Sequence, residues 1–318
     1  MAATVPLDHA VGLEQAAPRP LARPILRKLT SDLTARIGLG LVALFLLIAA
    51  VGPSLAPHDP REVTTDRLVG PSLDHLLGTD GLGRDLFSRL LHGARLTLGT
   101  ALLAAVLVTA IGLVIGTLSG YAGGLVDSLL MRVVDMVLAI PGLVLALAVA
   151  GLFEPSLVAV MLGLVTIWWA GYARVVRGLV LSVRNRPFVE AAHAVGASRW
   201  RILVRHILPS VVSPVIVLAT LDVGQLVLVI SGLTFLGLGA PPPTPEWGAM
   251  LNDGRVYFLS DPQVVIIPGI AISLAVLGFN LLGDGIRDAL DPRLTAAGAT
   301  ARPRLLGRRW ARRRPPGP

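Results

Sequence analysis

The sequence lacks cysteine altogether, has a single lysine (Lys28) and has few charged residues for a chain of 318. Without cysteine there is no disulfide framework, thiolate metal site or cysteine nucleophile. Charged residues make up 15% of the chain, against roughly 25% in typical soluble domains. Hydrophobic residues make up 53%. This composition excludes most cytosolic enzymes and favours a membrane protein.

The sequence also lacks the short motifs of common catalytic sites. The phosphate-binding pattern G-x-x-x-x-G-K-[ST] is absent, so the chain does not hydrolyse ATP by that route. The hydrolase patterns H-E-x-x-H and G-x-S-x-G are absent as well. Gly38, Gly40 and Ala43 imitate part of a dinucleotide fingerprint, but they lie inside an apolar run with no strand before them. We therefore predict that the chain is not an enzyme and carries no cofactor or resident metal of its own.

Apolar residues gather in largely uncharged runs of about 20 residues, the length that crosses a hydrocarbon layer about 30 Å thick. The runs cover residues 37–57, 96–121, 133–153, 157–181, 208–236 and 264–283. The first run is too long for a signal peptide and lacks a small-residue cleavage context, so we expect it to remain as an anchor. The pattern predicts an all-α membrane protein with six transmembrane helices.

The runs divide the chain into segments with different surroundings. These are an N-terminal tail (1–36), a first transmembrane helix (37–57), an external segment (58–95), a five-helix core (96–290) and a basic C-terminal tail (291–318). Most of the 28 Lys and Arg lie in the N-terminal tail, in residues 174–205 and after Asp284. Cytoplasmic loops retain basic residues, so both termini are predicted to be cytoplasmic and residues 58–93 and 239–262 external. The arginines of this basic chain thus set membrane orientation, and we predict no nucleic-acid partner.

Residues 184–209, between the fourth and fifth runs, carry signals for two short helices joined by a turn. Pro187 suits a helix start, Glu190 falls in the first turn, and Gly196 supplies the left-handed residue that ends the helix. Ser198 then caps a second helix. We interpret this compact loop as a docking site for a partner protein. The alternative is an amphipathic helix that rests on the membrane surface.

This loop resembles the E-A-A-x-x-x-G loop of permease subunits in bacterial ATP-binding-cassette (ABC) importers. The match is carried by the following residues: Glu190, Ala191, Ala192, Gly196, Leu208 and Pro209. The family pattern has an apolar residue where His206 stands. The resemblance implies the type I ABC importer permease fold in a bacterial inner membrane, with the loop inserted into a cleft of an ATPase subunit.

Further segments are similar to the C-type permeases of the dipeptide, oligopeptide and nickel branch, and the resemblance covers about residues 37–294. They are residues 77–89, 131–135, 235–239, 245–248 and 280–292. The resemblance implies a homologous permease, two ATP-binding subunits that use the ATP, and an extracytoplasmic solute-binding protein as partners. Membrane lipid is a further partner, and we expect the basic stretch 308–314 to contact either anionic lipid or solvent.

The cargo is open between nickel, in chelated form, and small peptides. Peptide permeases of this branch often have a glutamate where Ile230 stands in this chain. Residues 218–224 and 247–253 are more similar to the nickel permeases. We therefore favour a nickel chelate and keep small peptides as the alternative.

Asp222 is a carboxylate inside the fifth apolar run, where an ionisable group is costly. It is a candidate for the translocation pathway, and the alternative is a structural group paired with an arginine or with backbone donors. A different class of function would make Asp222 the ion or proton relay of a secondary transporter. Such transporters are built from inverted repeats, and the sequence shows none.

Other polar residues are interpreted as structural. His58, His75 and His92 lack helical ligand spacing, so we expect ordinary loop polarity. Arg132 and Asp135 lie three apart and are expected to pair. The remaining expectations concern helices: Thr79 or Asp80 caps a surface helix that carries Arg84, Ser88, Arg89 and Arg95, and Gly112, Gly116 and Gly120 form a packing face.

Overall fold

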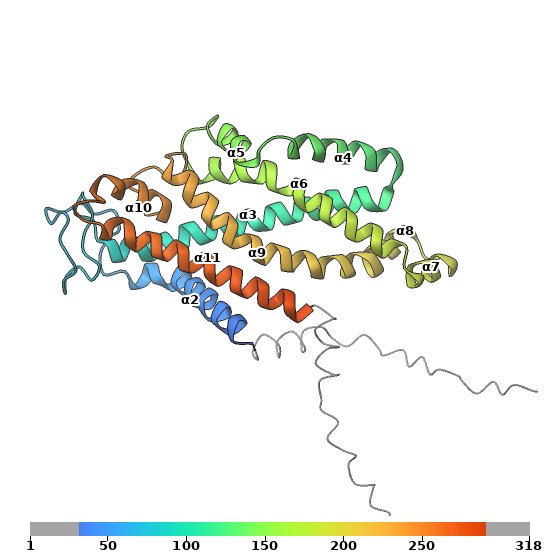
Figure 1. Ribbon diagram of the computed structural model, residues 1–318, viewed down its shortest axis with the longest axis horizontal. Helices are drawn as coiled ribbons and strands as arrows, with labels where there is room; N and C mark the ends of the chain where they lie inside the picture. Colours follow the sequence, from blue (N-terminus) through green and yellow to red (C-terminus); the bar gives the residue numbers. More distant parts are fainter. Residues whose placement is uncertain (1–31, 291–318) are drawn as a thin grey trace, which may run out of the picture.

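The computed structural model describes residues 32–290, and nearly all of this part of the chain is helical (Figure 1). Between residues 32 and 290 there is no strand, only an isolated bridge between Thr79 and Asp85. The helices are α2 (Leu33–Leu55), α3 (Leu86–Ala122), α4 (Gly124–Leu138), α5 (Gly142–Ala150), α6 (Leu157–Arg184), α7 (Pro187–Ala194), α8 (Arg199–Ile202), α9 (Leu208–Phe235), α10 (Trp247–Gly254) and α11 (Gln263–Leu290). A π-helical turn, η1 (Leu203–Ile207), and a 3-10 turn, η2 (Arg255–Tyr257), complete the order. The all-α prediction is confirmed. Residues 1–31 of the predicted N-terminal tail and the whole predicted C-terminal tail, with the basic stretch 308–314, lie outside the described residues.

Five stretches of helix in the described part of the chain are long and apolar enough to cross a membrane, namely α2, α3, α6, the stretch from α8 through α9, and α11. The predicted third span, residues 133–153, is not one continuous helix. It is replaced by α4 and α5, which meet at a bend of 84° and make a sixth span only if they are counted together. The break falls at Ile140 and Pro141, because proline disfavours helical backbone at the preceding residue and offers no amide hydrogen.

The second spanning helix begins earlier than the apolar run suggested. α3 starts at Leu86, where the Asp85 carboxylate accepts a hydrogen bond from the Ser88 amide at 2.7 Å. Asp85 is therefore the cap, and the expectation that Thr79 or Asp80 caps a separate surface helix is wrong. Arg84 and Arg89 lie just before and within the start of α3. They can be buried there because ion pairs with aspartates neutralise their charges.

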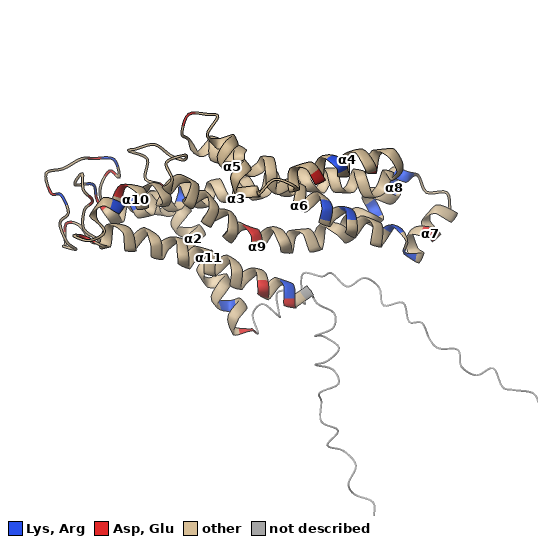
Figure 2. Ribbon diagram, turned by 45° about the horizontal axis from the view of Figure 1, so that its top comes forward, with Lys and Arg blue, Asp and Glu red and all other residues tan. Residues whose placement is uncertain are grey.

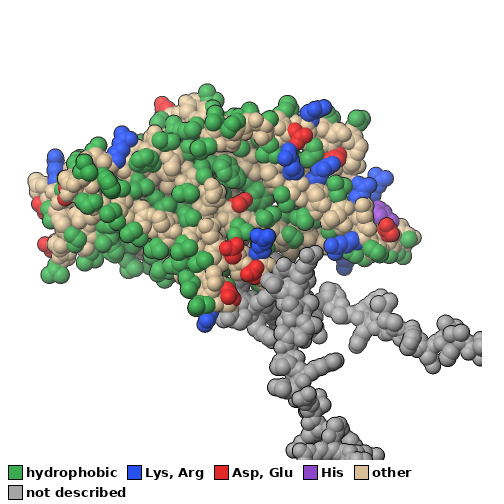
Figure 3. Space-filling view, in the orientation of Figure 1, with side chains coloured by type: hydrophobic (Ala, Val, Ile, Leu, Met, Phe, Trp, Pro, Cys, Tyr) green, Lys and Arg blue, Asp and Glu red, His purple; other side chains and the backbone are tan. Residues whose placement is uncertain are grey.

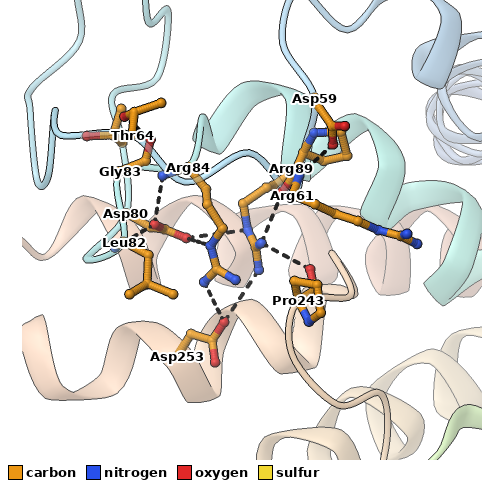
Figure 4. Close-up of polar contacts among 12 residues, drawn as sticks. Asp59, Arg61, Thr64, Asp80, Leu82, Gly83, Arg84, Arg89, Pro243 and Asp253 are labelled. Atoms are coloured by element: carbon orange, nitrogen blue, oxygen red, sulfur yellow. Dashed lines mark hydrogen bonds and ion pairs between the residues drawn. The ribbon is translucent and has the colours of Figure 1, made fainter.

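That cluster joins the start of α3 to α10 (Figure 4). Arg84 donates to Asp80 at 2.6 Å and to Asp253 at 2.8 Å, and Arg89 lies 3.4 Å from the same Asp253 carboxylate. Both arginine side chains are almost completely buried, at 2% and 1% exposure. Arg89 also donates to the Pro60 and Pro243 carbonyl oxygens. An arrangement of the loops that separated these partners would leave a buried charge without a partner, which is costly. The ion pairs therefore favour the one arrangement in which all the charges are paired.

A second polar contact holds α10 against α3. The buried carboxylate of Glu246 accepts hydrogen bonds from the Thr97 hydroxyl at 2.8 Å and from the Ala249 amide at 2.9 Å. Burial raises the pKa of the Glu246 carboxyl, while the hydrogen bonds that it accepts oppose this shift. The neighbouring Trp247 is buried and donates its indole N–H to the Leu90 carbonyl at 3.0 Å. Hydrogen bonds from Glu246 and Trp247 thus hold α10 against α3 at this end of the bundle.

α3 and α6 pack closely through a row of glycines. A side chain added at Gly112 would collide with Tyr172, and one at Gly116 would collide with the Ala173 carbonyl oxygen. A Cβ atom at Gly120 would lie 2.9 Å from the Val180 Cβ. The predicted glycine packing face is therefore confirmed, because only hydrogen at these positions allows the two backbones to approach so closely.

The glycine that imitated a nucleotide motif has the same packing role elsewhere. A Cβ atom at Gly38 of α2 would lie 2.7 Å from the backbone carbon of Leu281 in α11. Gly278 of α11 faces α2 in turn, where a Cβ atom would lie 2.9 Å from the Leu41 Cβ. Gly38 thus allows α2 and α11 to pack closely, which agrees with our rejection of a phosphate-binding function.

The bundle has two chemically different ends and an apolar middle. Residues 56–85 and α10 lie at one end of the long axis, and α7 and α8 lie at the other (Figure 1). Charged residues gather around α10 and the neighbouring loop, and again around α4, α7, α8 and the free ends of α2 and α11 (Figure 2). Hydrophobic side chains cover the middle of the face seen in Figure 3. This distribution is the one expected of helices that lie in a hydrocarbon layer.

Replacement of Gly116 by leucine is expected to disrupt the α3–α6 contact, because the collision involves backbone as well as the Val176 side chain. We expect the free energy of unfolding in detergent to fall by about 2 kcal/mol or more, as in other overpacked cores. Gly99→Leu is the matched control on the same helix, since a Cβ atom there meets nothing within 4 Å. Equal thermal stability of the two variants would contradict the packing role of Gly116.

Candidate functional site

The loop between α6 and α9, residues 184–209, forms a helix–turn–helix that we call the elbow. It consists of α7, a turn at Gly196, α8 and the π-helical turn η1, which leads directly into α9. The two short helices and the glycine turn that the sequence predicted are therefore present. The elbow occupies one end of the bundle (Figure 1).

Local hydrogen bonds explain why the elbow adopts this shape. Pro187 is the first residue of α7, Glu190 lies in its first turn, and Gly196 has a φ angle of +79°. The Gly196 amide donates to the His193 carbonyl at 3.0 Å, and the Ala197 amide donates to the Ala192 carbonyl at 3.1 Å. This pair of bonds is a Schellman motif, which satisfies the last carbonyls of a helix and requires a left-handed residue.

A glycine is needed in this turn for its backbone conformation and not for lack of room. Nothing lies within 4 Å of a Cβ atom built on Gly196. Ser198 then starts the second helix, where its hydroxyl accepts a hydrogen bond from the Arg201 amide at 3.3 Å. The turn is consequently specified by Gly196 and Ser198 within the elbow itself.

One side of the elbow is anchored in the bundle. Val189 of α7 and Ile202 of α8 are fully buried, in a cluster with Val180 of α6 and Val211 of α9. The Tyr121 hydroxyl, at the end of α3, donates to the Arg199 carbonyl at 2.8 Å. The base of the elbow is therefore packed against three of the long helices.

The other side of the elbow, which we call its tip, is largely exposed. The side chains of Val195 and Trp200 are 85% and 72% exposed. Glu190, Ala191 and Gly196 are exposed and Ala192 is half-buried. An exposed apolar surface on a rigid base is typical of a surface that a partner covers.

The remaining motif residues lie apart from this tip. Leu208, half-buried, and Pro209, exposed, begin α9. The ring of His206, where the family pattern has an apolar residue, lies beside the Phe188 ring of α7, with centroids 6.5 Å apart. The sequence analysis did not single out Trp200 as a candidate contact residue. Its position between Arg199 and Arg201 in a polar loop was the available signal.

Asp222 lies in α9 and is half-buried. Its carboxylate accepts a hydrogen bond from the Tyr172 hydroxyl of α6 at 2.7 Å. The partner is thus a tyrosine on a neighbouring helix and not the arginine or backbone donors that we considered. The carboxylate keeps capacity to accept further hydrogen bonds, because a carboxylate has two oxygens with about four lone-pair sites.

The ion pairs of α4 differ from those expected. Asp135 pairs with Arg174 of α6 at 2.6 Å, and the predicted pair with Arg132 does not form. Asp127 accepts two hydrogen bonds from Arg177, at 2.6 and 2.7 Å. Both pairs therefore tie α4 to α6, which compensates for the break after Leu138.

The structure also brings together residues that the sequence analysis left as ordinary loop polarity. His58, His75 and Asp85 each offer a ligand atom within 4.8 Å of the other two. His92 lies outside this group, and its ring nitrogen lies 2.9 Å from the Ser88 carbonyl oxygen. No spacing rule signals this group, since its members come from three separate turns of the chain.

Comparison with known proteins gives a consistent set of relatives. Residues 112–296 match the family described as "binding-protein-dependent transport system inner membrane component", and residues 21–71 match the N-terminal transmembrane domain of oligopeptide transport permease C. The nickel transport system permease protein NikC of Escherichia coli K12 is 43% identical over 267 residues, or 84% of this chain and 96% of that protein.

Relatives with other cargo names are equally similar. The dipeptide transport system permease protein DppC of Alkalihalophilus pseudofirmus is 41% identical over 273 residues, 86% of this chain and 90% of that protein. The glutathione transport system permease protein GsiD of Pectobacterium atrosepticum is 43% identical over 255 residues, 80% of this chain and 85% of that protein.

Proposed function

The chain belongs to the family of inner-membrane components of binding-protein-dependent transport systems, and we propose that it forms half of the translocation pathway of an ABC importer. It is a multi-pass membrane permease, and permeases of this family are not enzymes. Membership of this family removes the alternative of a self-sufficient secondary transporter. The other half of the pathway is assigned to a homologous permease, whose own elbow completes a symmetric motor.

The elbow is the proposed contact with an ATP-binding subunit. Its exposed tip on a buried base is the observation that carries the proposal, because force from a partner reaches the long helices only through a rigid connection. Two such subunits use the ATP, one at each elbow, and this chain binds none. An extracytoplasmic solute-binding protein delivers the cargo to the opposite end of the bundle.

The elbow end of the bundle is proposed to face the cytoplasm, together with both termini. The arginines at 184, 186, 199, 201 and 205 all lie on the elbow. At the opposite end Arg84 and Arg89 are buried in ion pairs with aspartates, while Arg61, Arg67, Arg95 and Arg255 are exposed. The elbow is favoured as the cytoplasmic end because the segment from Arg174 to Arg205 and the two tails together hold most of the basic residues of the sequence.

Asp222 is the proposed pathway carboxylate. It is half-buried, and a carboxylate at membrane depth persists where it meets water, a cation or a partner. The Tyr172 hydroxyl holds one of its oxygens, which fixes the side chain in place. The Asp222 charge is then available to attract a cationic cargo.

The proposed cargo is a nickel chelate, with small peptides as the second candidate. The similarity of residues 218–224 and 247–253 to nickel permeases supports nickel. The match to the nickel permease NikC, which covers 96% of that protein, supports it as well. Dipeptide and glutathione permeases of similar identity favour the peptide alternative. Ile230 does not contribute to this choice, because its side chain is completely buried in the core of the chain.

Disruption of the elbow tip is expected to abolish ATP-driven uptake while the protein remains inserted. Gly196→Trp adds bulk and places a side chain at a left-handed position, and Glu190→Arg reverses an exposed charge. Uptake in proteoliposomes and co-purification of the ATPase measure the two effects. Glu154→Arg is the matched control, an exposed glutamate outside the elbow. Normal uptake and co-purification in both elbow variants would refute the docking proposal.

The proposed topology is tested by labelling of single cysteines in this cysteine-free chain. Leu73→Cys and Leu259→Cys should react with an impermeant reagent from outside intact cells, while Val195→Cys should react only after permeabilisation. These side chains are 96%, 96% and 85% exposed, so the membrane and not burial limits access. Reaction of Val195→Cys from outside would reverse the orientation.

Neutralisation of Asp222 is expected to lower uptake at least tenfold, equivalent to about 1.4 kcal/mol at the limiting step. Asp222→Asn keeps the size of the side chain and an acceptor for Tyr172. Tyr172→Phe is the companion variant, because it removes the hydrogen bond and leaves the charge. Loss of uptake in Tyr172→Phe but not in Asp222→Asn would assign Asp222 a structural role only.

A further inference from the structure

Three separate segments meet at the end of the bundle opposite the elbow. His58 follows α2, His75 lies in the loop that crosses this end, and Asp85 caps α3. The His75 Nδ1 atom lies 3.0 Å from Asp85 Oδ1, and the two histidine ring centroids are 4.9 Å apart. The group thus contains two imidazoles and one carboxylate, the ligand types that first-row transition metals prefer.

The two oxygens of Asp85 have different environments. Oδ2 accepts the Ser88 amide at 2.7 Å, which caps α3 and fixes the orientation of the carboxylate. Oδ1 faces His75 and is the oxygen available to an ion. In protein metal sites, a carboxylate that binds the metal through one oxygen is commonly held in place by a hydrogen bond to its other oxygen.

His58 supplies an independent observation. Its Nδ1 atom is buried and has no hydrogen-bond partner in the described structure. The atom lies 3.9 Å from Asp85 Oδ2, and the His58 amide is tied to the Ser88 hydroxyl at 3.1 Å. A buried polar atom without a partner destabilises a protein unless something binds to it. An ion between the three side chains would give this nitrogen a partner.

The distances require only small movements for all three residues to bind one ion. Ligand atoms at about 2.1 Å from a metal lie about 3.0–3.5 Å apart in octahedral or tetrahedral geometry. His75 Nδ1 and Asp85 Oδ1 already have this spacing, in a hydrogen bond of 3.0 Å that an ion would replace. The ligand atoms of all three residues lie within 4.8 Å of one another, so His58 would have to approach by about 1–2 Å.

An entry route is also present. His58 lines a pocket of about 720 Å³, together with Asp59, Arg61, His92 and Arg95. Three protein ligands leave coordination positions open for water or a second ligand from this pocket. Asp59 and Asp85 offset the positive charge of the two arginines near the ion.

We propose that His58, His75 and Asp85 form a binding site for a divalent transition-metal ion such as Ni²⁺, Co²⁺ or Zn²⁺. The ion links the segment after α2, the crossing loop and the start of α3. Mg²⁺ and Ca²⁺ do not fit, because they require oxygen ligands. The site is independent of the cargo that the permease carries.

The test is direct metal binding by the full chain, purified with its partner subunits through a tag without histidines. Titration calorimetry with Ni²⁺ alone, and metal analysis after gel filtration, should give one equivalent per chain. His58→Gln and His75→Gln should each weaken binding at least about tenfold, because each removes a ligand. Bound Co²⁺ should give a visible absorption spectrum that changes in His58→Gln.

His58→Gln is the decisive variant, since its ring nitrogen makes no hydrogen bond that the substitution would break. His92→Gln, in the same pocket, and His193→Gln, in the elbow, are the matched controls and should bind like the parent. Equal Ni²⁺ binding by the parent and the His58→Gln/His75→Gln double variant would overturn the proposal, as would loss of binding in His92→Gln alone.

The assay separates this inference from the proposed function, because no transport is measured. Absence of metal binding with intact ATP-driven uptake would overturn the site and leave the importer proposal standing. Metal binding with normal uptake in the elbow variants would support the site and refute elbow docking.

Discussion

The close contact between α3 and α6 is the constraint on which the rest of the molecule depends. A lipid environment supplies no hydrophobic force between helices, so association requires small residues that let backbones approach. Gly112, Gly116 and Gly120 meet this requirement. The same contact places Tyr172 where it reaches Asp222 on α9, and it carries α6 to the point where the elbow begins.

The two long helices also connect the two polar ends of the bundle. α3 is capped by Asp85, beside the two histidines and the buried arginines, and its last turn contains Tyr121, which holds the base of the elbow. Each end combines buried apolar side chains with hydrogen bonds or ion pairs. A movement of the elbow relative to α3 would break the contact between Tyr121 and the Arg199 carbonyl.

Much of the fold and part of the candidate site followed from local signals. The apolar runs predicted the long helices, and Pro187, Gly196 and Ser198 predicted the elbow, because caps and left-handed turns depend on a few neighbouring residues. The break between α4 and α5 was missed, although Pro141 marked it. The start of α3 was placed too late, because buried ion pairs compensate charges that a hydropathy pattern counts as exposed.

The sequence by itself determined that this chain crosses a membrane, belongs among importer permeases and contains a helix–turn–helix between its fourth and fifth apolar runs, since composition and local turn chemistry carry that information. Only the tertiary structure decided which side chains meet. The Asp222 carboxylate accepts a hydrogen bond from a tyrosine and not from an arginine. Asp135 forms an ion pair with Arg174 and not with Arg132. His58 and His75 lie close to Asp85. These contacts join residues from different helices and loops, and their geometry depends on how closely the glycine-lined helices pack.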